Sequence, residues 1–251
     1  MDYFLTIAAS DNSGGAGIQQ DIKVAQALGY WPLSAITGIT VQNFRQVFEL
    51  EATPSRCLKA QIEQCFLSFP LKAVKIGALC SAEHLAVIVD CLKRFPQRPV
   101  ILDPVLFATD GTPFLNEAAL HDLKCRLFPL TDLITPNKQE FELLARQCCD
   151  DLEEAIGLAQ KKCLEWQCSI LLKGGHFDGA MIKEALVTAR GVFRFERERK
   201  SFPYAHGTGC TLSSALASYL GKGQSLEEAY HLASQFLVEY YEQINKQMAN
   251  E

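Results

Sequence analysis

The stretch that decides the fold is YFLTIAASDNSGGAGIQQDIKVAQALGY, residues 3–30. Residues 3–10 are apolar and rich in strand-forming side chains, so they predict a strand. Residues 11–21 contain three glycines and show no periodicity. Residues 22–30 place apolar side chains at helical spacing, with Gly29 as a C-cap signal. A strand, a glycine-rich turn and a helix form the unit from which α/β proteins are built.

The same alternation continues along most of the chain. Apolar patterns predict further strands at 31–43, 71–79, 98–106, 132–137 and 168–176. They predict further helices at 55–69, 82–95, 117–128, 139–148, 153–166, 210–223 and 225–244, and a hairpin at 183–199. Such alternation implies a largely parallel sheet covered on both faces. We therefore predict an α/β fold, a three-layer αβα sandwich with a mainly parallel central sheet, as a single domain over residues 1–251.

Composition excludes several classes of protein. The 251 residues are 48% hydrophobic and 21% charged, which is typical of a globular domain with a deep core. A net charge of −5 argues against nucleic acid as a partner, and RFERERK (194–200), mixed in sign, predicts a solvated edge. No apolar run is long enough to span a membrane, and residues 1–10 lack the pattern of a secretory leader. The ten cysteines show no zinc spacing, so we expect reduced thiols in a cytoplasmic protein.

Polar or glycine-rich residues follow several of the predicted strands. These stretches are DNSGGAG (11–17), VQN (41–43), KIGAL (75–79), DPV (103–105), TPNKQE (135–140) and KGGH (173–176). Each alone is typical of a turn. In a parallel sheet, however, ligands bind beyond the carboxyl ends of the strands. Together the stretches predict a ligand site along one edge of the sheet.

Two of these side chains fit a nitrogen-containing ring. Asp21 stands about one turn into a helix, where its carboxylate either favours the positive end of the helix dipole or accepts from an amino group of a ligand. Gln42 either bonds to a neighbouring loop or offers a donor and an acceptor to a heteroaromatic ring.

Four others fit a phosphate or a metal ion. Asp103 either caps a turn or contacts the hydration shell of Mg²⁺, which uses few carboxylates. Asn137 and Glu140 either form a capping box or join Asp103. Lys173 either lies at the surface or reaches a nucleotide phosphate. The role of His176 stays open.

The stretch AHGTGCTLSSALASYL, residues 205–220, joins glycines and a thiol to the start of a predicted helix. Gly207, Thr208 and Gly209 let successive N–H groups converge on one point, as an anion site for a transferred phosphoryl group requires. The same positive helix end lowers a thiol pKa, which predicts Cys210 as a base or nucleophile. The alternative is a glycine-rich loop with a packed cysteine.

The order SGGAGIQQD, VQN, KIG, DPV, TPN with Glu140, KGGH and HGTGCTLSSALA resembles the hydroxymethylpyrimidine/phosphomethylpyrimidine kinases of thiamine biosynthesis. This family lies within the ribokinase-like superfamily, and the resemblance covers about residues 4–240. It implies a ribokinase-like sandwich without a separate lid domain, and a homodimer.

The resemblance also implies roles for individual residues. The aminopyrimidine is expected to lie against Gln42, Asp21, Ala9, Ala78 and Val105. ATP is expected to lie against Lys173, Asn137 and Thr208, and Mg²⁺ against Asp103 and Glu140. The catalytic group is expected to be Cys210, which replaces the catalytic aspartate of ribokinase-type sugar kinases, with an anion site at Gly207, Thr208 and Gly209.

The chain departs from the family pattern near the expected substrate site. VQNT-x-GV becomes VQNFRQV, so Phe44 and Gln46 replace small residues. Ala78 stands where the family has a methionine after KIG, and Thr109 stands where it has a lysine.

We therefore expect an ATP- and Mg²⁺-dependent kinase for 4-amino-5-hydroxymethyl-2-methylpyrimidine. The sequence leaves open whether the monophosphate is a second substrate. One alternative is a kinase for a vitamin B6 alcohol such as pyridoxal, because both substrates are hydroxymethyl-bearing nitrogen rings. Another is a non-catalytic ligand-binding module that kept the pocket.

Overall fold

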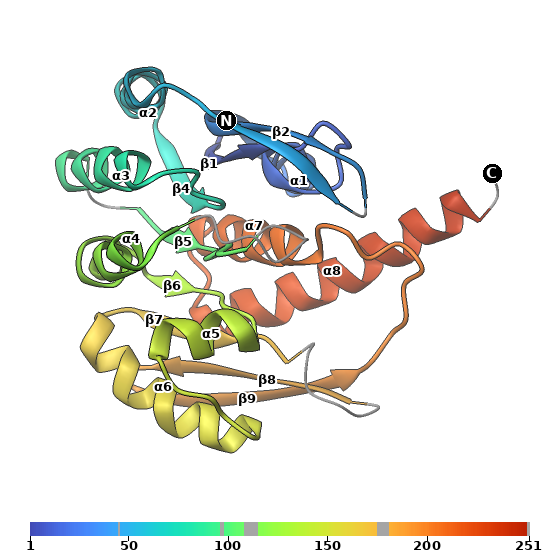
Figure 1. Ribbon diagram of the computed structural model, residues 1–251. Coiled ribbons are helices and arrows are strands. Elements are labelled where there is room, and N and C mark those ends of the chain that lie inside the picture. The colour runs from blue at the N-terminus through green and yellow to red at the C-terminus, as the bar shows by residue number, and fades with distance from the viewer. Residues whose placement is uncertain (45, 96–97, 108–114, 175–180, 250–251) are drawn as a thin grey trace.

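A single mixed sheet runs through the protein (Figure 1). The structure is a computed structural model and describes all residues except 45, 96–97, 108–114, 175–180 and 250–251. The strand order is β3-β2-β1-β4-β5-β6-β7-β8-β9. The six strands from β2 to β7 in this order are parallel, whereas β3, β8 and β9 pair in antiparallel fashion at the two edges. The predicted α/β sandwich with a mainly parallel sheet is confirmed.

The strands are β1 (Tyr3–Ser10), β2 (Trp31–Gln42), β3 (Val47–Ala52), β4 (Leu71–Ile76), β5 (Val100–Leu102), β6 (Leu133–Ile134), β7 (Ser169–Leu172), β8 (Met181–Thr188) and β9 (Gly191–Glu198). The helices are α1 (Gly17–Ala27), α2 (Ser55–Ser68), α3 (Ala82–Arg94), α4 (Glu117–Asp122), α5 (Lys138–Ala145), α6 (Leu152–Trp166), α7 (Thr208–Gly221) and α8 (Leu226–Met248). Among the helices of the described chain, none has both the length and the apolar character needed to cross a membrane.

The differences from the predicted elements have local causes. Strand β3 was not predicted, because it is a short edge strand whose residues are exposed or half-buried and show little alternation. Helix α1 begins at Gly17, before its apolar periodicity starts. The predicted helix 117–128 ends as α4 at Asp122 and continues as a π turn and a 3₁₀ turn, the second of which contains Pro129.

Two apolar cores cover the two faces of the sheet (Figure 1). Helices α2 to α6 pack on one face, and α1, α7 and α8 pack on the other. Successive side chains of β4 point to opposite faces, so Val74 and Ile76 pack in the core under α2 to α6, and Ala73 packs in the core under α1, α7 and α8. Lys75 follows the parity of Ala73, so its side chain faces α1 and α7. Lys75 therefore lies at the floor of the site described next.

Candidate active site

A cavity of about 270 Å³ lies at the carboxyl ends of the parallel strands. It is formed by the ends of β1, β2 and β4, the segments after β5, β6 and β7, and the first turns of α1 and α7. We call it the strand-end cavity. The predicted residues that line it are Ala9, Gln42, Ala78, Asp103, Val105, Asn137, Glu140, Lys173, Gly207, Gly209 and Cys210. Residues from distant parts of the sequence are thus brought together, as the rule for parallel sheets predicts.

A second hollow of about 440 Å³ adjoins the first and shares Asn137, Lys173 and Gly209 with it. We call it the basic groove, because Arg197, Arg199 and Lys200 also line it. Thr208 lies here and not in the strand-end cavity. The sequence analysis missed the three cations because it assigned RFERERK to a solvated edge. Strand β9 is indeed an edge strand, but the cations at its end face this groove.

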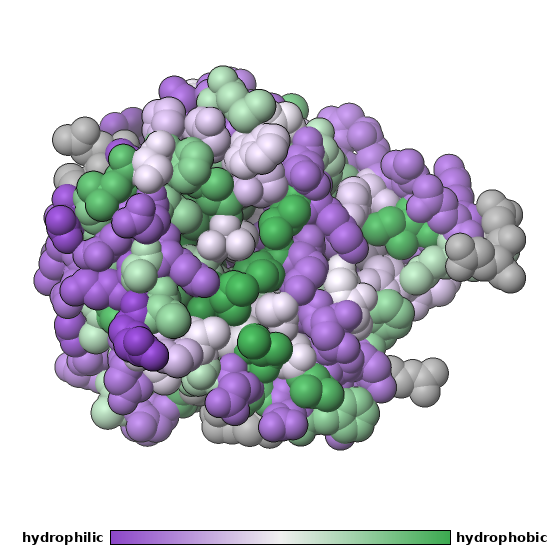
Figure 2. Space-filling model, turned by 90° about the horizontal axis from the view of Figure 1, so that it is seen from above, coloured by the Kyte–Doolittle hydropathy of each residue, from purple (hydrophilic) through white to green (hydrophobic). Residues whose placement is uncertain are grey.

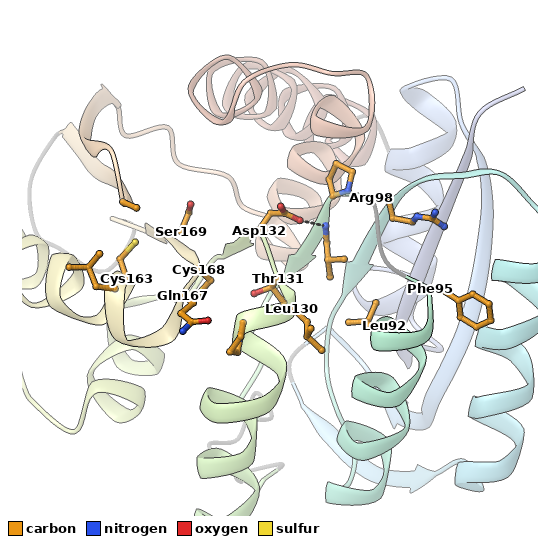
Figure 3. A pocket seen from close by; sticks show the side chains of 15 residues that line it. Leu92, Phe95, Arg98, Leu130, Thr131, Asp132, Cys163, Gln167, Cys168 and Ser169 are labelled. Atoms are coloured by element: carbon orange, nitrogen blue, oxygen red, sulfur yellow. Dashed lines mark hydrogen bonds between the residues drawn. The ribbon is translucent and has the colours of Figure 1, made fainter.

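A larger hollow, about 890 Å³, lies at the amino ends of the parallel strands, opposite the strand-end cavity (Figure 3). Val100, Asp132 and Ser169, at the amino ends of three parallel strands, line it. The Asp132 carboxylate accepts the backbone N–H of Val100 at 2.8 Å, the dashed line in Figure 3. Burial raises the pKa of Asp132. This carboxyl group thus secures a strand start, and the hollow contains none of the predicted site residues.

Asp103, which is buried, and Lys173, which is partly exposed, form an ion pair where the strand-end cavity meets the basic groove. Lys173 Nζ and Thr135 Oγ1 each donate to Asp103 Oδ1 at 2.9 Å. Burial of the Asp103 carboxylate raises its pKa, but the charges of Lys173 and Lys75, with the hydrogen bonds, outweigh burial and lower it. Burial lowers the pKa of Lys173, but the carboxylates of Asp103 and Glu140 raise it overall. Both groups of the pair are therefore charged near neutral pH.

Asn137 and Glu140 form the capping box that one interpretation of the sequence anticipated. The Asn137 N–H donates to Glu140 Oε2 at 2.8 Å, and the Glu140 N–H donates to Asn137 Oδ1 at 2.9 Å. This arrangement uses the carbonyl oxygen of Asn137 and not its amide NH₂. Burial raises the pKa of Glu140 to about 7, although the charge of Lys173 opposes it. The capping box is compatible with a ligand role, because both residues also line the strand-end cavity.

The residues present suit Mg²⁺. In the described part of the chain, no group of three or more His, Cys, Asp or Glu side chains could hold a metal by itself. Mg²⁺ needs only one or two carboxylates, because waters and substrate phosphates complete its shell. Asp103 Oδ2 accepts one long hydrogen bond, from Ser213 Oγ at 3.5 Å, among the described residues, and Glu140 lines the same cavity.

Asp21 lies beneath the strand-end cavity and does not line it. Its carboxylate is fully buried and accepts from Thr6 Oγ1 at 2.5 Å, from Ser214 Oγ at 2.7 Å and from Lys75 Nζ at 2.9 Å to both oxygens. The predicted direct contact between Asp21 and a substrate is therefore not supported by its position. Lys75, in the KIG stretch, is the group of this cluster that lines the cavity. The sequence signal for it was a lysine inside an apolar strand.

Two glycine loops pack against each other at one wall of the strand-end cavity. Gly207 is the N-cap of α7, with a φ of +82°, and no side chain caps the helix. A Cβ on Gly207 would lie 1.8 Å from the carbonyl oxygen of Gly15. A Cβ on Gly209 would lie 3.4 Å from Asp103 Oδ2 and 3.5 Å from Lys173 Nζ. The first N–H groups of α7 have no partners inside the helix, although the Thr208 N–H donates to the carbonyl oxygen of Ala205 at 3.4 Å. Uncapped helix N-termini of this kind suit anions.

Cys210 lies in the first turn of α7 and is partly exposed to the cavity. The predicted lowering of its pKa is wrong. Burial raises the pKa of the Cys210 thiol to about 11. The charge of Lys75 and a hydrogen bond from the Gly17 N–H lower it, but Asp21 and Asp103 add to the rise. The thiol is therefore neutral near pH 7.

Asp11 organises the first glycine loop and was missed by the sequence analysis. Its carboxylate accepts from the N–H groups of Ser13 at 2.7 Å, Gly15 at 3.1 Å and Ala16 at 2.7 Å. His206 Nε2 lies 3.2 Å from Asp11 Oδ2 and ties this loop to the segment before α7. An aspartate at a strand end before serine and glycines is the signature of such a turn.

Of the departures from the family pattern that the structure describes, Ala78 lines the strand-end cavity, whereas Phe44 and Gln46 lie in the loop after β2. The Phe44 ring packs edge-to-face on Tyr204 at 5.1 Å and lies 6.0 Å from the His206 ring. Phe44 therefore joins the loop after β2 to the segment before α7. The Gln46 N–H donates to Asn43 Oδ1 within the same loop, and Ala78 lines the cavity. Thr109 and His176 lie outside the described residues.

Comparison with known proteins places these features in a family. The model of the phosphomethylpyrimidine kinase family matches residues 11–249. The chain is 37% identical over 240 residues to the hydroxymethylpyrimidine/phosphomethylpyrimidine kinase of Haemophilus influenzae, covering 93% of this chain and 88% of that protein.

Solved structures of related kinases have the same fold as this chain. The crystal structure of a phosphomethylpyrimidine kinase from Clostridium difficile superposes with a TM-score of 0.84 at 35% identity, covering 96% of this chain and 99% of that one. The ADP complex of Bacillus subtilis pyridoxal kinase gives a TM-score of 0.85 at 27% identity, covering 94% and 90%. The fold and the motif residues thus agree with one group of small-molecule kinases.

Proposed function

Because the chain belongs to the phosphomethylpyrimidine kinase family, we propose that it transfers the γ-phosphoryl group of ATP to the hydroxyl of 4-amino-5-hydroxymethyl-2-methylpyrimidine, in thiamine biosynthesis. The observation that best supports this reaction is the junction of two hollows. The strand-end cavity and the basic groove share Asn137, Lys173 and Gly209. An alcohol in the first and a nucleotide in the second would meet at these residues.

The nucleotide fits the basic groove by charge. Arg197, Arg199 and Lys200 line the groove together with one carboxylate, that of Glu184, and Lys173 stands at its junction with the cavity. Arg197 Nε lies 3.5 Å from Glu184 Oε2, and Lys200 pairs with Glu242, so the cations outnumber the acidic group that lines the groove. Phosphoryl transfer depends on positioning and on neutralising charge on the phosphate oxygens. The N-terminus of α7, with Thr208 and Gly209 in its first turn, supplies N–H donors at the same junction. We assign the β- and γ-phosphates to this junction.

We assign Mg²⁺ to Asp103 and Glu140, which line the cavity beside the phosphate junction. When bound, Mg²⁺ would neutralise charge on the phosphate oxygens. Asp103 offers an ionised carboxylate whose Oδ1 is fixed by Lys173 and Thr135, whereas Oδ2 accepts one long hydrogen bond, from Ser213 Oγ, and is the oxygen we assign to a water or metal. Glu140 becomes more anionic as pH rises through about 7.

We assign the aromatic end of the substrate to the part of the strand-end cavity that the basic groove does not share. Gln42, Val105 and Ala78 line it, so an amide stands beside apolar surface. The Gln42 N–H donates its backbone hydrogen bond to Asn12 Oδ1 at 2.7 Å, which fixes the end of β2. The side-chain amide can then pair with adjacent donor and acceptor atoms of an aminopyrimidine.

Replacing Gln42 with alanine is expected to raise the KM for the pyrimidine about tenfold or more, because a paired polar group of the substrate loses its partner. The KM for ATP should stay within about twofold, since Gln42 does not line the basic groove. Steady-state kinetics with each substrate varied in turn would measure both. A parallel rise in the two KM values would contradict the assignment.

The proposed function is tested by a product assay. The enzyme, ATP and Mg²⁺ are incubated with 4-amino-5-hydroxymethyl-2-methylpyrimidine or with pyridoxal, and products are identified by mass spectrometry. We expect the pyrimidine monophosphate; a diphosphate would show that the monophosphate is a second substrate. Preferential turnover of pyridoxal would favour the vitamin B6 alternative, to which the Bacillus subtilis structure is similar. No phosphorylated product from either alcohol would overturn the proposal.

We also propose a homodimer, as the resemblance implied. Figure 2 looks down on the side of the molecule where β2 and α2 lie in Figure 1, and apolar residues gather there between polar ones. Ile39 and Val41 alternate along β2 and are 54% and 51% exposed, and Phe48 on the adjacent β3 is 61% exposed. Exposed apolar clusters of this kind commonly mark interfaces.

The double variant Ile39→Glu/Val41→Glu is expected to behave as a monomer of 27.9 kDa in sedimentation equilibrium, because two charges would be buried in the interface. Leu164→Glu, at an apolar residue 69% exposed on α6, is the matched control and should leave the dimer intact. Equal masses for the two variants would contradict this choice of surface.

We further propose that residues 1–251 act as one kinase unit in the cytoplasm. All the described strands lie in one sheet, which supports a single unit. Each of the ten cysteines is free, which suits a reducing compartment.

A further inference from the structure

Lys75 is a charged side chain placed at the floor of the strand-end cavity. It lies near the end of β4, and its side chain has no solvent exposure. It nevertheless lines the cavity. A lysine is almost never fully buried unless it is paired. The structure supplies its partner in Asp21, whose two carboxylate oxygens each lie 2.9 Å from Lys75 Nζ.

The ammonium group has one donor more than this pair uses. A lysine offers three N–H donors. Two directions are taken by Asp21 Oδ1 and Oδ2, and these are its hydrogen bonds within the described part of the chain. A Cβ on Gly77 would lie 3.0 Å from both Lys75 Nζ and Ala8 Cβ, so any larger residue in KIG would crowd the ammonium. The third donor is therefore left for a molecule in the cavity.

The surroundings of Asp21 fix the ammonium in place. Thr6 on β1 and Ser214 on α7 both donate to the Asp21 carboxylate. Two structural elements, β1 and α7, thus hold one carboxylate of α1, and that carboxylate holds Lys75. A buried ion pair commonly adds little net stability over apolar residues of the same volume. This arrangement is better explained by a need for a fixed positive charge at this point.

The position of Lys75 within the cavity indicates which atom of the substrate accepts its hydrogen bond. Lys75 lines the strand-end cavity together with Cys210 and Asp103, the residues of the proposed phosphoryl-transfer end. Under the proposed function, the atom of the substrate that must reach this end is the hydroxyl oxygen. We infer that Lys75 is a catalytic residue whose ammonium donates a hydrogen bond to the reacting hydroxyl oxygen, and that Asp21 is its positioning residue. This inference rests on the proposed function.

The test compares two ligands that differ only in that oxygen. Isothermal titration calorimetry measures the Kd of 4-amino-5-hydroxymethyl-2-methylpyrimidine and of 4-amino-2,5-dimethylpyrimidine, without ATP. The unaltered enzyme should bind the alcohol roughly 10- to 100-fold more tightly, as for a hydrogen bond to a charged donor. In Lys75→Met this ratio should fall to about one, with a matching loss in kcat.

Lys75→Met leaves the Asp21 carboxylate buried without its counter-charge, which can prevent folding. The double variant Lys75→Met/Asp21→Asn removes both charges; the amide oxygen accepts from one of the two hydroxyls of Thr6 and Ser214, and the amide NH₂ donates to the other once that hydroxyl rotates. It should fold and show the same ratio of about one. Lys173→Met is the matched control, because it removes the other lysine that lines the described part of the cavity. This control should weaken ATP binding and keep the preference for the alcohol.

A ratio in the double variant equal to that of the unaltered enzyme would overturn this inference and leave the proposed function standing. If the unaltered enzyme bound neither pyrimidine, the proposed function would fail, and the inference with it. The inference would also be overturned if Lys173→Met lost the preference for the alcohol. Removing either lysine would then abolish this preference, and it would not report a hydrogen bond from Lys75.

Discussion

Cys210→Ala is expected to lower kcat by about 10²–10⁴-fold, the usual contribution of a group that accepts a proton in the transition state. The thiol lines the strand-end cavity in the first turn of α7, beside the proposed phosphate junction. Its removal takes away one sulfur atom and no buried charge, since the thiol is neutral near pH 7. We therefore expect an unchanged melting temperature and an unchanged KM for ATP.

The pH dependence of kcat tells whether Cys210 takes the proton itself. Burial raises the thiol pKa to about 11, so the thiolate fraction grows about tenfold per pH unit below that value. If the thiolate is the base, kcat rises between pH 8 and 10. Cys210→Ser keeps the size of the side chain but does not ionise in this range, so it should lose the rise. We expect this difference between the two profiles.

Cys80→Ala is the matched control for both measurements. Cys80 is also partly buried, but its sulfur lies against Thr37 Oγ1 at 3.5 Å and does not line the strand-end cavity. It should retain near-normal kcat and the unaltered pH profile. Near-normal kcat in Cys210→Ala would remove Cys210 from the catalytic group. Parallel profiles for the unaltered enzyme and Cys210→Ser would show that the thiol only shapes the site.

Gly207→Ala is expected to lower kcat/KM for ATP by about 10²–10³-fold, the effect of losing an oxyanion-type donor. The φ of Gly207 is +82°, and a Cβ would lie 1.8 Å from the backbone oxygen of Gly15. Because that contact is with backbone, the start of α7 must move. The N–H groups of its first turn then leave the phosphate junction. The strained φ adds a loss of about 1–3 kcal/mol in the free energy of unfolding.

Gly157→Ala is the control for a glycine-to-alanine change. Gly157 lies inside α6, and a Cβ there would have no atom within 4 Å. This change should stabilise the protein by about 0.5–1 kcal/mol and leave the kinetics unaltered. Steady-state kinetics and chemical denaturation measure both effects. Unchanged kcat/KM in Gly207→Ala would show that the GTGC loop does not hold the phosphate.

Much of the fold and many of the site residues could be predicted, because the relevant signals are local. The capping box of Asn137 and Glu140 can be predicted from the spacing of these two residues. The positive φ at position 207 can be predicted because glycine readily adopts it. Edge strand β3 was missed because its half-exposed residues carry a weak pattern. The groove-lining role of Arg197 was missed because a mixed charge run gives no sign of what faces it.

The sequence by itself determined the alternation of strands and helices, and with it the sheet edge at which Gln42, Asp103, Lys173 and Cys210 meet. That result follows from periodicity and from the rule that ligands bind at the carboxyl ends of parallel strands.

Only the tertiary structure decided the electrostatics of the site. It placed Asp21 beneath the cavity as the partner of Lys75, and it raised the Cys210 pKa where helix position alone predicted the opposite. The physical reason is that desolvation depends on every element packed around a group. Residue spacing along one segment determines a helix end or a turn. The desolvation of the Asp21–Lys75 pair, in contrast, depends on β1, α1, β4 and α7 packing together.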